Sequence, residues 1–354
     1  MSFRTKRIIF ITPFYMLFEF FLLKYIFLLL GGVDDIYLLI LTLFIGLNHF
    51  IPMFFEAKKS RKITRFLSTI DGVWMCTSVY FLIDILIVYL IGLFVDLSFE
   101  INLILLAIVP VISIYNYYKA HKLVIHEKTL NIPELGRDIN IAHLSDVHFG
   151  SVRHRQIIRQ VADNLKELEG TCELAVISGD LADGSSVVEK DDFKALSSVD
   201  MPIIFTPGNH DFYPGIDDVL EACRNAGVIV LDNECMEFDG LNICGLSYNI
   251  EDHSIPEVDS SFIKKDKVNI LNYHVPLYFD EFSQMGFDVQ LSGHTHGGQF
   301  YPVVWFGNLM FEYNMGLFKN RLGKYIHVTT GVGSMDTPMR WGTDSEIVIL
   351  KFRK

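Results

Sequence analysis

Four long apolar stretches near the start of the chain constrain its fold more than any other feature of the sequence. They cover residues 8–30, 36–55, 73–94 and 101–118, and each is close to the roughly 20 residues that a helix needs to cross a bilayer. The first is too long for the apolar core of a signal peptide, and Glu19 interrupts it. The sequence therefore predicts a four-helix transmembrane region and a multi-pass protein of the cell (inner) membrane.

Charged residues between the apolar stretches predict their orientation. Lys and Arg gather before the first stretch, between the second and third, and after the fourth, whereas the other two loops carry Asp and Glu. Because basic loops stay on the cytoplasmic side of a membrane, both ends of the region and the domain that follows are expected in the cytoplasm. The five cysteines form no CxxC pair, which favours a reducing compartment without disulfides.

A few polar side chains interrupt the apolar stretches. Ionisable groups inside a membrane are candidates for function, but these form no recognisable relay in the sequence. We therefore expect them to bridge helices within a small bundle or to reach the membrane surface. They are Glu19, Lys24, Asn48, His49 and Asp84.

The rest of the chain has the composition of a globular domain and an excess of acidic residues. The whole chain carries a formal net charge of −12, and all of the acidic excess lies after residue 140. This balance argues against nucleic-acid binding through a broad basic patch. We expect a four-span transmembrane region at 1–120, a connector at 121–138 and a catalytic domain at 139–354.

Polar side chains follow several short apolar strands of the globular region. Strands are expected at 139–144, 174–178, 203–206, 268–271 and 289–292, and Asp, His or Asn comes within a few residues of each end. In α/β sheets, ligands bind beyond the carboxyl ends of the strands, so these side chains should meet at one rim. The ordered set is Asp146-x-His148, Gly179-Asp180, Gly208-Asn209-His210-Asp211, His274 and Gly293-His294-x-His296.

These residue types are typical of a metal site. Nitrogen and oxygen ligands without a thiolate suit Mn, Fe, Zn, Co or Ni. Two metal ions about 3.5–4 Å apart can share a carboxylate and act together on a phosphoryl group. The set therefore predicts a site for two divalent metal ions of unknown identity.

The ordered motifs resemble those of the calcineurin-like metallophosphoesterase superfamily. In particular, Gly-His-Thr-His-Gly-Gly-Gln at 293–299 is similar to a run in bacterial membrane-associated phosphoesterases. The resemblance covers about 139–354 and implies an α/β fold, a four-layer α-β-β-α sandwich with two mixed sheets. By position it implies a first metal on Asp146, His148 and His296, a second on Asn209, His274 and His294, Asp180 as the bridge, and two catalytic residues, His210 and, orienting its ring, Asp211.

The resemblance implies a membrane-anchored hydrolase of phosphomonoesters or phosphodiesters, using metal-activated hydroxide on a substrate at or near the bilayer. One alternative is a UDP-diacylglucosamine-type lipid pyrophosphate hydrolase. Against it, the soluble family of that type carries Gly-Asn-Arg-Asp, where this chain has His210. A second alternative is a non-catalytic metal-binding sensor or scaffold, which the complete ligand set argues against. The oligomeric state stays open.

Two weaker features lie after the last motif. Arg340 is expected either to pair with phosphate or to form a salt bridge with one of the many carboxylates. A group of aromatic residues could line an apolar substrate groove, touch the bilayer or belong to the core, and the core is the preferred interpretation. The group comprises Phe300, Tyr301, Trp305, Phe306, Phe311 and Tyr313.

Overall fold

The structure is a computed structural model that describes residues 3–248 and 254–354. The chain divides into two compact units. The first, here called the membrane unit, comprises Met1–Lys119 and the short segment Asp336–Met339. The second, here called the globular unit, comprises Ala120–Met335 and Arg340–Lys354. Each is described by itself.

Four long helices make up most of the membrane unit. All four are long and apolar enough to cross a membrane, which confirms the four predicted stretches. The third helix begins at Lys62, eleven residues before the predicted apolar stretch. The basic and polar residues ahead of that stretch are also helical. The helices are α1 (Phe3–Leu29), α2 (Asp35–Glu56), α3 (Lys62–Gly92) and α4 (Phe99–His121).

Several of the polar residues in these helices bridge neighbouring helices, as expected. The indole Nε1–H of Trp74 on α3 donates to Glu19 Oε2 on α1 at 3.0 Å. His49 Nδ1 on α2 lies 2.9 Å from Asp71 Oδ2 on α3. These contacts place charged and polar groups against each other instead of against lipid, where an unsatisfied group is costly.

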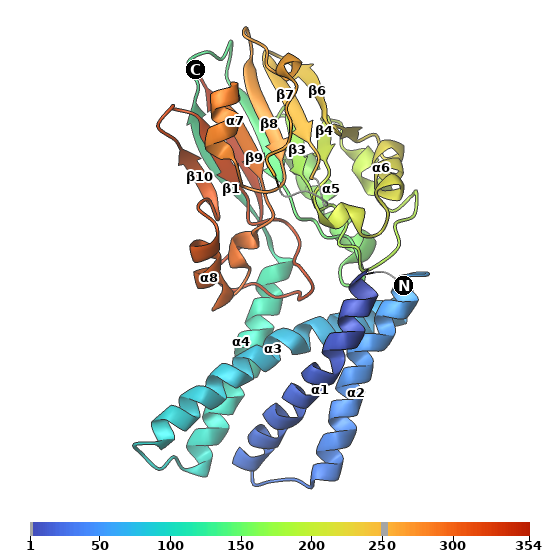
Figure 1. The fold of residues 1–354 in the computed structure, drawn as a ribbon, viewed down its shortest axis with the longest axis vertical. Coiled ribbons are helices and arrows are strands. Elements are labelled where there is room, and N and C mark those ends of the chain that lie inside the picture. The colour runs from blue at the N-terminus through green and yellow to red at the C-terminus, as the bar shows by residue number, and fades with distance from the viewer. Residues whose placement is uncertain (1–2, 249–253) are drawn as a thin grey trace. The chain divides into compact units, whose positions relative to one another are not determined.

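Two six-stranded sheets form the centre of the globular unit (Figure 1). The first has the order β1-β12-β2-β3-β4-β5 and the second β10-β11-β9-β8-β7-β6. The strands are β1 (Leu123–Asn131), β2 (Ile139–Leu144), β3 (Leu174–Ser178), β4 (Ile203–Thr206), β5 (Ile229–Val230), β6 (Glu234–Phe238), β7 (Leu241–Leu246), β8 (Val268–Tyr273), β9 (Val289–Ser292), β10 (Gly316–Lys319), β11 (Tyr325–Val328) and β12 (Ser345–Arg353).

Alternate residues of each central strand face different cores. On β3, Ala175 and Ile177 pack against the outer helices, whereas Leu174 and Val176 pack between the sheets. Both faces are covered, so these strands are continuous apolar runs. The outer layers contain α5 (His154–Glu167) and α6 (Ile216–Asn225) on the first sheet and α7 (Phe279–Met285) on the second. The four-layer α-β-β-α prediction is confirmed.

The segment assigned to the connector contains a strand. Leu123–Asn131 forms β1, which pairs in parallel with β12 along nine residue pairs. Leu130 is the one fully buried residue of this edge strand, and the apolar run Leu123–Ile125 at its start is too short to predict a strand by itself. The globular unit therefore begins almost directly after α4.

One expectation about the cysteines is wrong. Cys235 on β6 and Cys244 on β7 lie directly opposite each other in an antiparallel pair and form a disulfide. The sequence pattern did not reveal this pair because the hairpin, not a short CxxC spacing, brings the two residues together. Cys76, Cys172 and Cys223 are free and buried.

Candidate metal centre

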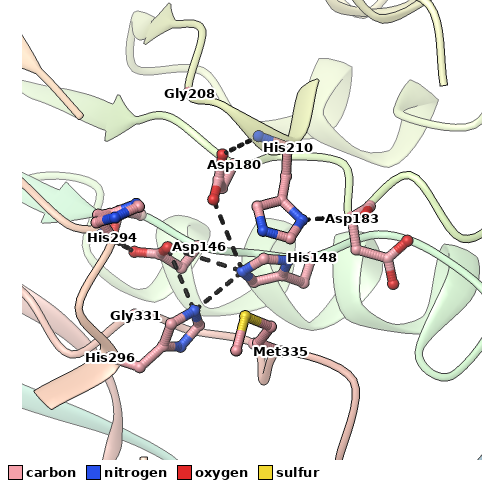
Figure 2. A network of polar contacts seen from close by, with 12 residues as sticks. Asp146, His148, Asp180, Asp183, Gly208, His210, His294, His296, Gly331 and Met335 are labelled. Atoms are coloured by element: carbon pink, nitrogen blue, oxygen red, sulfur yellow. Dashed lines mark hydrogen bonds and ion pairs between the residues drawn. The ribbon is translucent and has the colours of Figure 1, made fainter. Parts of the chain in front are cut away.

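The predicted polar residues gather at one rim, where strands of both sheets end (Figure 2). Asp146 and His148 follow β2, Asp180 follows β3, and His294 and His296 follow β9. These five non-glycine residues have a left-handed backbone, with φ between 50° and 73°. Such a conformation costs about 1–3 kcal/mol for each residue and is concentrated at functional sites. The sharp turns point the side chains back across the strand ends.

The first ligand group consists of Asp146, His148 and His296, all buried. The two Nε2 atoms of His148 and His296 lie 3.0 Å apart. Asp146 Oδ1 lies 3.4 Å from His296 Nε2 and 3.7 Å from His148 Nε2. Figure 2 shows these three side chains converging from two segments, the loop after β2 and the loop after β9.

The second ligand group consists of Asp180, His274 and His294. Asp180 Oδ2 lies 3.1 Å from His274 Nε2, and His294 Nδ1 lies 3.3 Å from the same nitrogen. Asn209 adds its side-chain oxygen, which lies 3.0 Å from His294 Nδ1. The predicted second set therefore converges as well.

Asp180 connects the two groups through a single oxygen. Its Oδ2 is 3.1 Å from His274 Nε2 in the second group and 4.0 Å from His148 Nε2 in the first. Its other oxygen, Oδ1, accepts a hydrogen bond from the backbone N–H of His210 at 2.8 Å. The carboxylate is thus held with Oδ2 directed at both groups.

The donor set fits cations better than it fits protons. In the first group, a proton on one imidazole nitrogen can be shared with only one neighbouring atom. A cation can instead bind Asp146 Oδ1 and the Nε2 atoms of His148 and His296 together. Asp146 Oδ1, which faces both histidines, is one of several buried atoms of the described residues that have no hydrogen-bond partner. Buried polar atoms are rarely left in this state. The two groups therefore fit a dinuclear metal site.

The electrostatics of the rim favour positive charge. Burial alone would raise the pKa of the Asp146 carboxyl, but the nearby His296 and His148 hold it well below its usual range. Burial lowers the pKa of His274, but the Asp180 and Asp146 carboxylates outweigh this effect and raise it to about 10. Burial and the neighbouring His274 lower the pKa of His294 to about 4. Burial would also raise the pKa of the Asp180 carboxyl, but the neighbouring His274 lowers it, so two ionised carboxylates lie in a buried site.

Surrounding groups orient the ligands. His274 Nδ1–H donates to the carbonyl oxygen of Ser178 at 2.7 Å, which leaves Nε2 available for a metal. Ser178 Oγ in turn contacts His143 Nε2 at 2.7 Å, and His143 Nδ1 lies 2.7 Å from His327 Nδ1. Both histidines lie inside strands, His143 in β2 and His327 in β11, and their link to His274 through Ser178 was not predicted.

Two glycines make room for the carboxylates. A Cβ at Gly208 would overlap the Asp180 carboxylate, and a Cβ at Gly293 would overlap Ser145 Oγ and the Asp146 carboxylate. Any larger residue at either position would displace a ligand. The glycines that precede Asn209 and His294 in the motifs are therefore required by close approach.

The predicted contact between Asp211 and His210 is wrong. The Asp211 carboxylate accepts hydrogen bonds from the backbone N–H groups of Asp180, Ala182 and Gly208, each at 2.8 Å. The His210 ring instead uses Nδ1–H to donate to the carbonyl oxygen of Asp183 at 3.1 Å (Figure 2). Burial and the Asp180 carboxylate raise the pKa of Asp211 to about 7, and the backbone donors oppose this rise. Asp211 shapes the loops that carry Asp180 and His210.

Neither expectation for Arg340 describes its contacts. The guanidinium is fully buried and donates to the backbone oxygens of Thr330 and Gly333, each at 2.6 Å, and to Thr343 Oγ1 at 3.1 Å. The Gly333 N–H donates to the carbonyl oxygen of Asp146 at 2.7 Å. Arg340 therefore braces the loop behind Asp146.

Comparison with known proteins places the globular unit in a family. Residues 139–298 match the calcineurin-like phosphoesterase family. A Helicobacter pylori protein named as a metallophosphoesterase is 29% identical over 236 residues, which are 64% of this chain and 63% of that protein. The chain thus spans less than two thirds of that relative.

Two further relatives match the same region. The Bacillus subtilis protein YpbG is 30% identical over 220 residues, 58% of this chain and 79% of that protein. A Danio rerio protein named as a transmembrane protein with a metallophosphoesterase domain is 26% identical over 272 residues, 70% of this chain and 62% of that protein. Together with the geometry of the rim, these matches show that the chain belongs to the calcineurin-like phosphoesterase family.

Proposed function

We propose that this protein is a membrane-anchored, metal-dependent hydrolase of phosphomonoesters or phosphodiesters. The observation that carries this proposal is the position of Asp180 Oδ2 between two complete ligand groups. We assign the membrane region to 1–120 and the catalytic domain to 139–354, and the strand β1 of the intervening segment pairs with the edge of the first sheet of that domain.

Each ligand has a role in this proposal. One divalent ion would be held by Asp146, His148 and His296. The other would be held by Asn209, His274 and His294, and Asp180 would contact both ions. Bound there, two such ions supply an activated water and neutralise charge on the phosphoryl group.

His210 would act on the leaving oxygen of the ester. Its Nδ1 is occupied by the Asp183 carbonyl, so Nε2 is the ring atom left to meet substrate. Its ring centroid lies 5.0 Å from that of His148, beside the first ligand group but outside both. This position suits a proton donor or a hydrogen-bond donor to phosphate.

The direct test is turnover by the purified full chain in lipid nanodiscs. A generic aryl phosphate monoester and an aryl phosphate diester would be assayed after chelation and after re-addition of single metals. We expect turnover that chelation removes and one or more of the metals restores. No turnover with any metal, in protein shown to bind two metal equivalents, would favour the non-catalytic sensor or scaffold.

We also propose that the globular unit faces the cytoplasm. The three basic segments of the membrane region support this side. The Cys235–Cys244 disulfide is the opposing observation, because disulfides persist mainly in oxidising compartments.

A reporter fused after Lys354 decides the orientation. A fluorescent protein that matures only in the cytosol should glow there, and alkaline phosphatase should be inactive. An active alkaline phosphatase fusion would place the globular unit outside. Thiol counting on protein extracted under acid quench would show whether the disulfide forms in the cell.

A further inference from the structure

Helix α8 (Val303–Met310) exposes an unusual number of large apolar side chains. Trp305 is 63% exposed, Phe306 58%, Leu309 83% and Met310 75%. The helix contains no charged residue. The expectation that Trp305 and Phe306 belong to the core is therefore wrong, and contiguous apolar patches of this kind mark interaction surfaces.

This apolar surface is attached to the metal-site rim. The buried side of α8 consists of Val304 and Gly307. Val304 packs so closely on Gly298 that a Cβ there would lie 2.6 Å from the Val304 Cα. Gly298 ends the short helix η4 (His296–Gly298), whose first residue is a proposed ligand. The exposed side chains of α8 therefore follow the proposed ligand His296 closely in the sequence, and the helix packs against the segment that carries this ligand.

The chain leaves the membrane region at the same edge of the globular unit. One residue, Lys122, separates α4 from β1, and the carbonyl oxygen of Ala120 accepts from Ser345 Oγ at 2.9 Å. Ser345 begins β12, which runs antiparallel to β2 with Val348 opposite His143. The start of β12 therefore lies at the end of β2 that leads to Asp146 and His148.

The end of α4 has the composition of a membrane interface. Tyr115, Tyr117 and Tyr118 are exposed near its last turns, and aromatic side chains concentrate where a bilayer meets water. From Tyr118 to Leu123 the chain can extend at most about 18 Å. The chain therefore enters the globular unit through a short covalent link at the edge that carries both the rim and α8.

We propose that α8 inserts its exposed apolar side chains into the bilayer interface and presents the metal site to phosphate esters carried by lipids. An aromatic and aliphatic surface without charge, held next to a membrane by a short covalent tether, matches the interfacial region of a phospholipid bilayer. The membrane contact does not depend on the activity of the protein. The assignment of a lipid-borne substrate rests on the proposed function.

A depth measurement tests the membrane contact. Leu309→Cys would carry an environment-sensitive fluorophore in the full chain in nanodiscs made with lipids brominated at shallow acyl positions. Leu322→Cys is the matched control, because Leu322 is exposed in the turn between β10 and β11, at the opposite end of β11 from the rim. The free native cysteines are buried, so the added thiol is the reactive one.

We expect the brominated lipids to quench the label at position 309 at least twofold and to leave the label at 322 unchanged. Equal quenching at both positions would overturn the proposal, because α8 would then approach the lipid no more closely than the control turn does. A label at 309 that responds to a water-soluble quencher instead, or to neither quencher because a second copy covers it, would also overturn it.

The substrate assignment has its own readout. The ratio of turnover on a phospholipid monoester in the nanodisc to turnover on a soluble aryl phosphate should fall about tenfold in Leu309→Glu and stay constant in Leu322→Glu. An unchanged ratio in Leu309→Glu would overturn the lipid-borne substrate. If wild type hydrolyses neither ester, the proposed function fails, and the quenching result still decides the membrane contact.

Discussion

The two units of this protein both bury ionisable side chains, but they satisfy them differently. In the membrane unit, Glu19 faces the indole N–H of Trp74, and His49 faces Asp71, so a donor can meet an acceptor across each pair of helices. In the globular unit, the Nε2 atoms of His148 and His296 face each other at 3.0 Å.

This contrast separates a structural arrangement from a candidate site. Donor–acceptor pairs of this kind serve helix packing, although Glu19 Oε1 and Asp71 Oδ1 stay buried without a hydrogen-bond partner. At the rim, nitrogen and oxygen atoms from loops of both sheets converge, which is the arrangement that a divalent cation needs. Burial of a charged residue therefore says little about function until the atoms that it faces are known.

The largest expected effect comes from Asp180→Asn, which removes the shared ligand. Turnover should be lost, and metal affinity should fall by more than the roughly 10–100-fold typical of residues that only support a ligand. Metal content by mass spectrometry and activity on an aryl phosphate provide the measurement. Asp163→Asn, on an exposed position of α5, is the matched control and should behave as wild type. Full activity of Asp180→Asn would reject the two-metal assignment.

Replacing His210 should slow turnover without removing metal. His210→Ala should lose about 10²–10⁴ in rate, the usual contribution of a general acid, with the greatest loss on poor leaving groups. His294→Ala provides the contrast, because it should lose metal. If His210→Ala loses metal to the same extent, His210 is a ligand and the two groups have been divided incorrectly.

A smaller effect should distinguish the two explanations of Asp211. Asp211→Asn replaces an oxygen that accepts from backbone N–H groups with an NH₂ that cannot accept. The free energy of unfolding should fall by about 1–3 kcal/mol. Thermal unfolding of the purified chain would show a lower Tm. An unchanged Tm with a large loss of rate would instead support a direct role for Asp211 on the His210 ring.

The smallest effect should come from the membrane unit. Trp74→Phe removes the donor to Glu19, and polar contacts between membrane helices contribute about 0.6 kcal/mol on average. The membrane unit should be slightly less resistant to denaturing detergent, while turnover and metal content stay the same. Ile87→Val, exposed on the same helix, is the control. A loss of turnover in Trp74→Phe would give the membrane helices a role beyond anchoring.

Much of the site could be predicted from the chain because each ligand follows a strand. The ends of β2, β3 and β9 are visible as apolar runs, and Asp146, Asp180 and His294 each come two residues after the strand end. The edge strand β1 was missed because most of its side chains are at least partly exposed, and it is held mainly by hydrogen bonds to β12. Backbone pairing of this kind leaves almost no pattern in side chains.

The orientation of each polar group could not be predicted. A motif places His210 beside Asp211, yet the sharp turn after β4 sends the Asp211 carboxylate toward three backbone N–H groups and the His210 ring toward the Asp183 carbonyl. Arg340 likewise turns to backbone oxygens, because a buried guanidinium must satisfy its donors locally.

The sequence by itself determined the four apolar helices, the alternation of strands and helices after them, and which side chains could bind metal. These follow from hydropathy, periodicity and chemical type, which are properties of single segments. Only the tertiary structure decided that Asp180 Oδ2 faces both ligand groups, that Cys235 and Cys244 are paired, and that α8 is exposed. Each of these depends on contacts between segments far apart in the chain, where the register of the strands and the direction of the turns set which atoms meet.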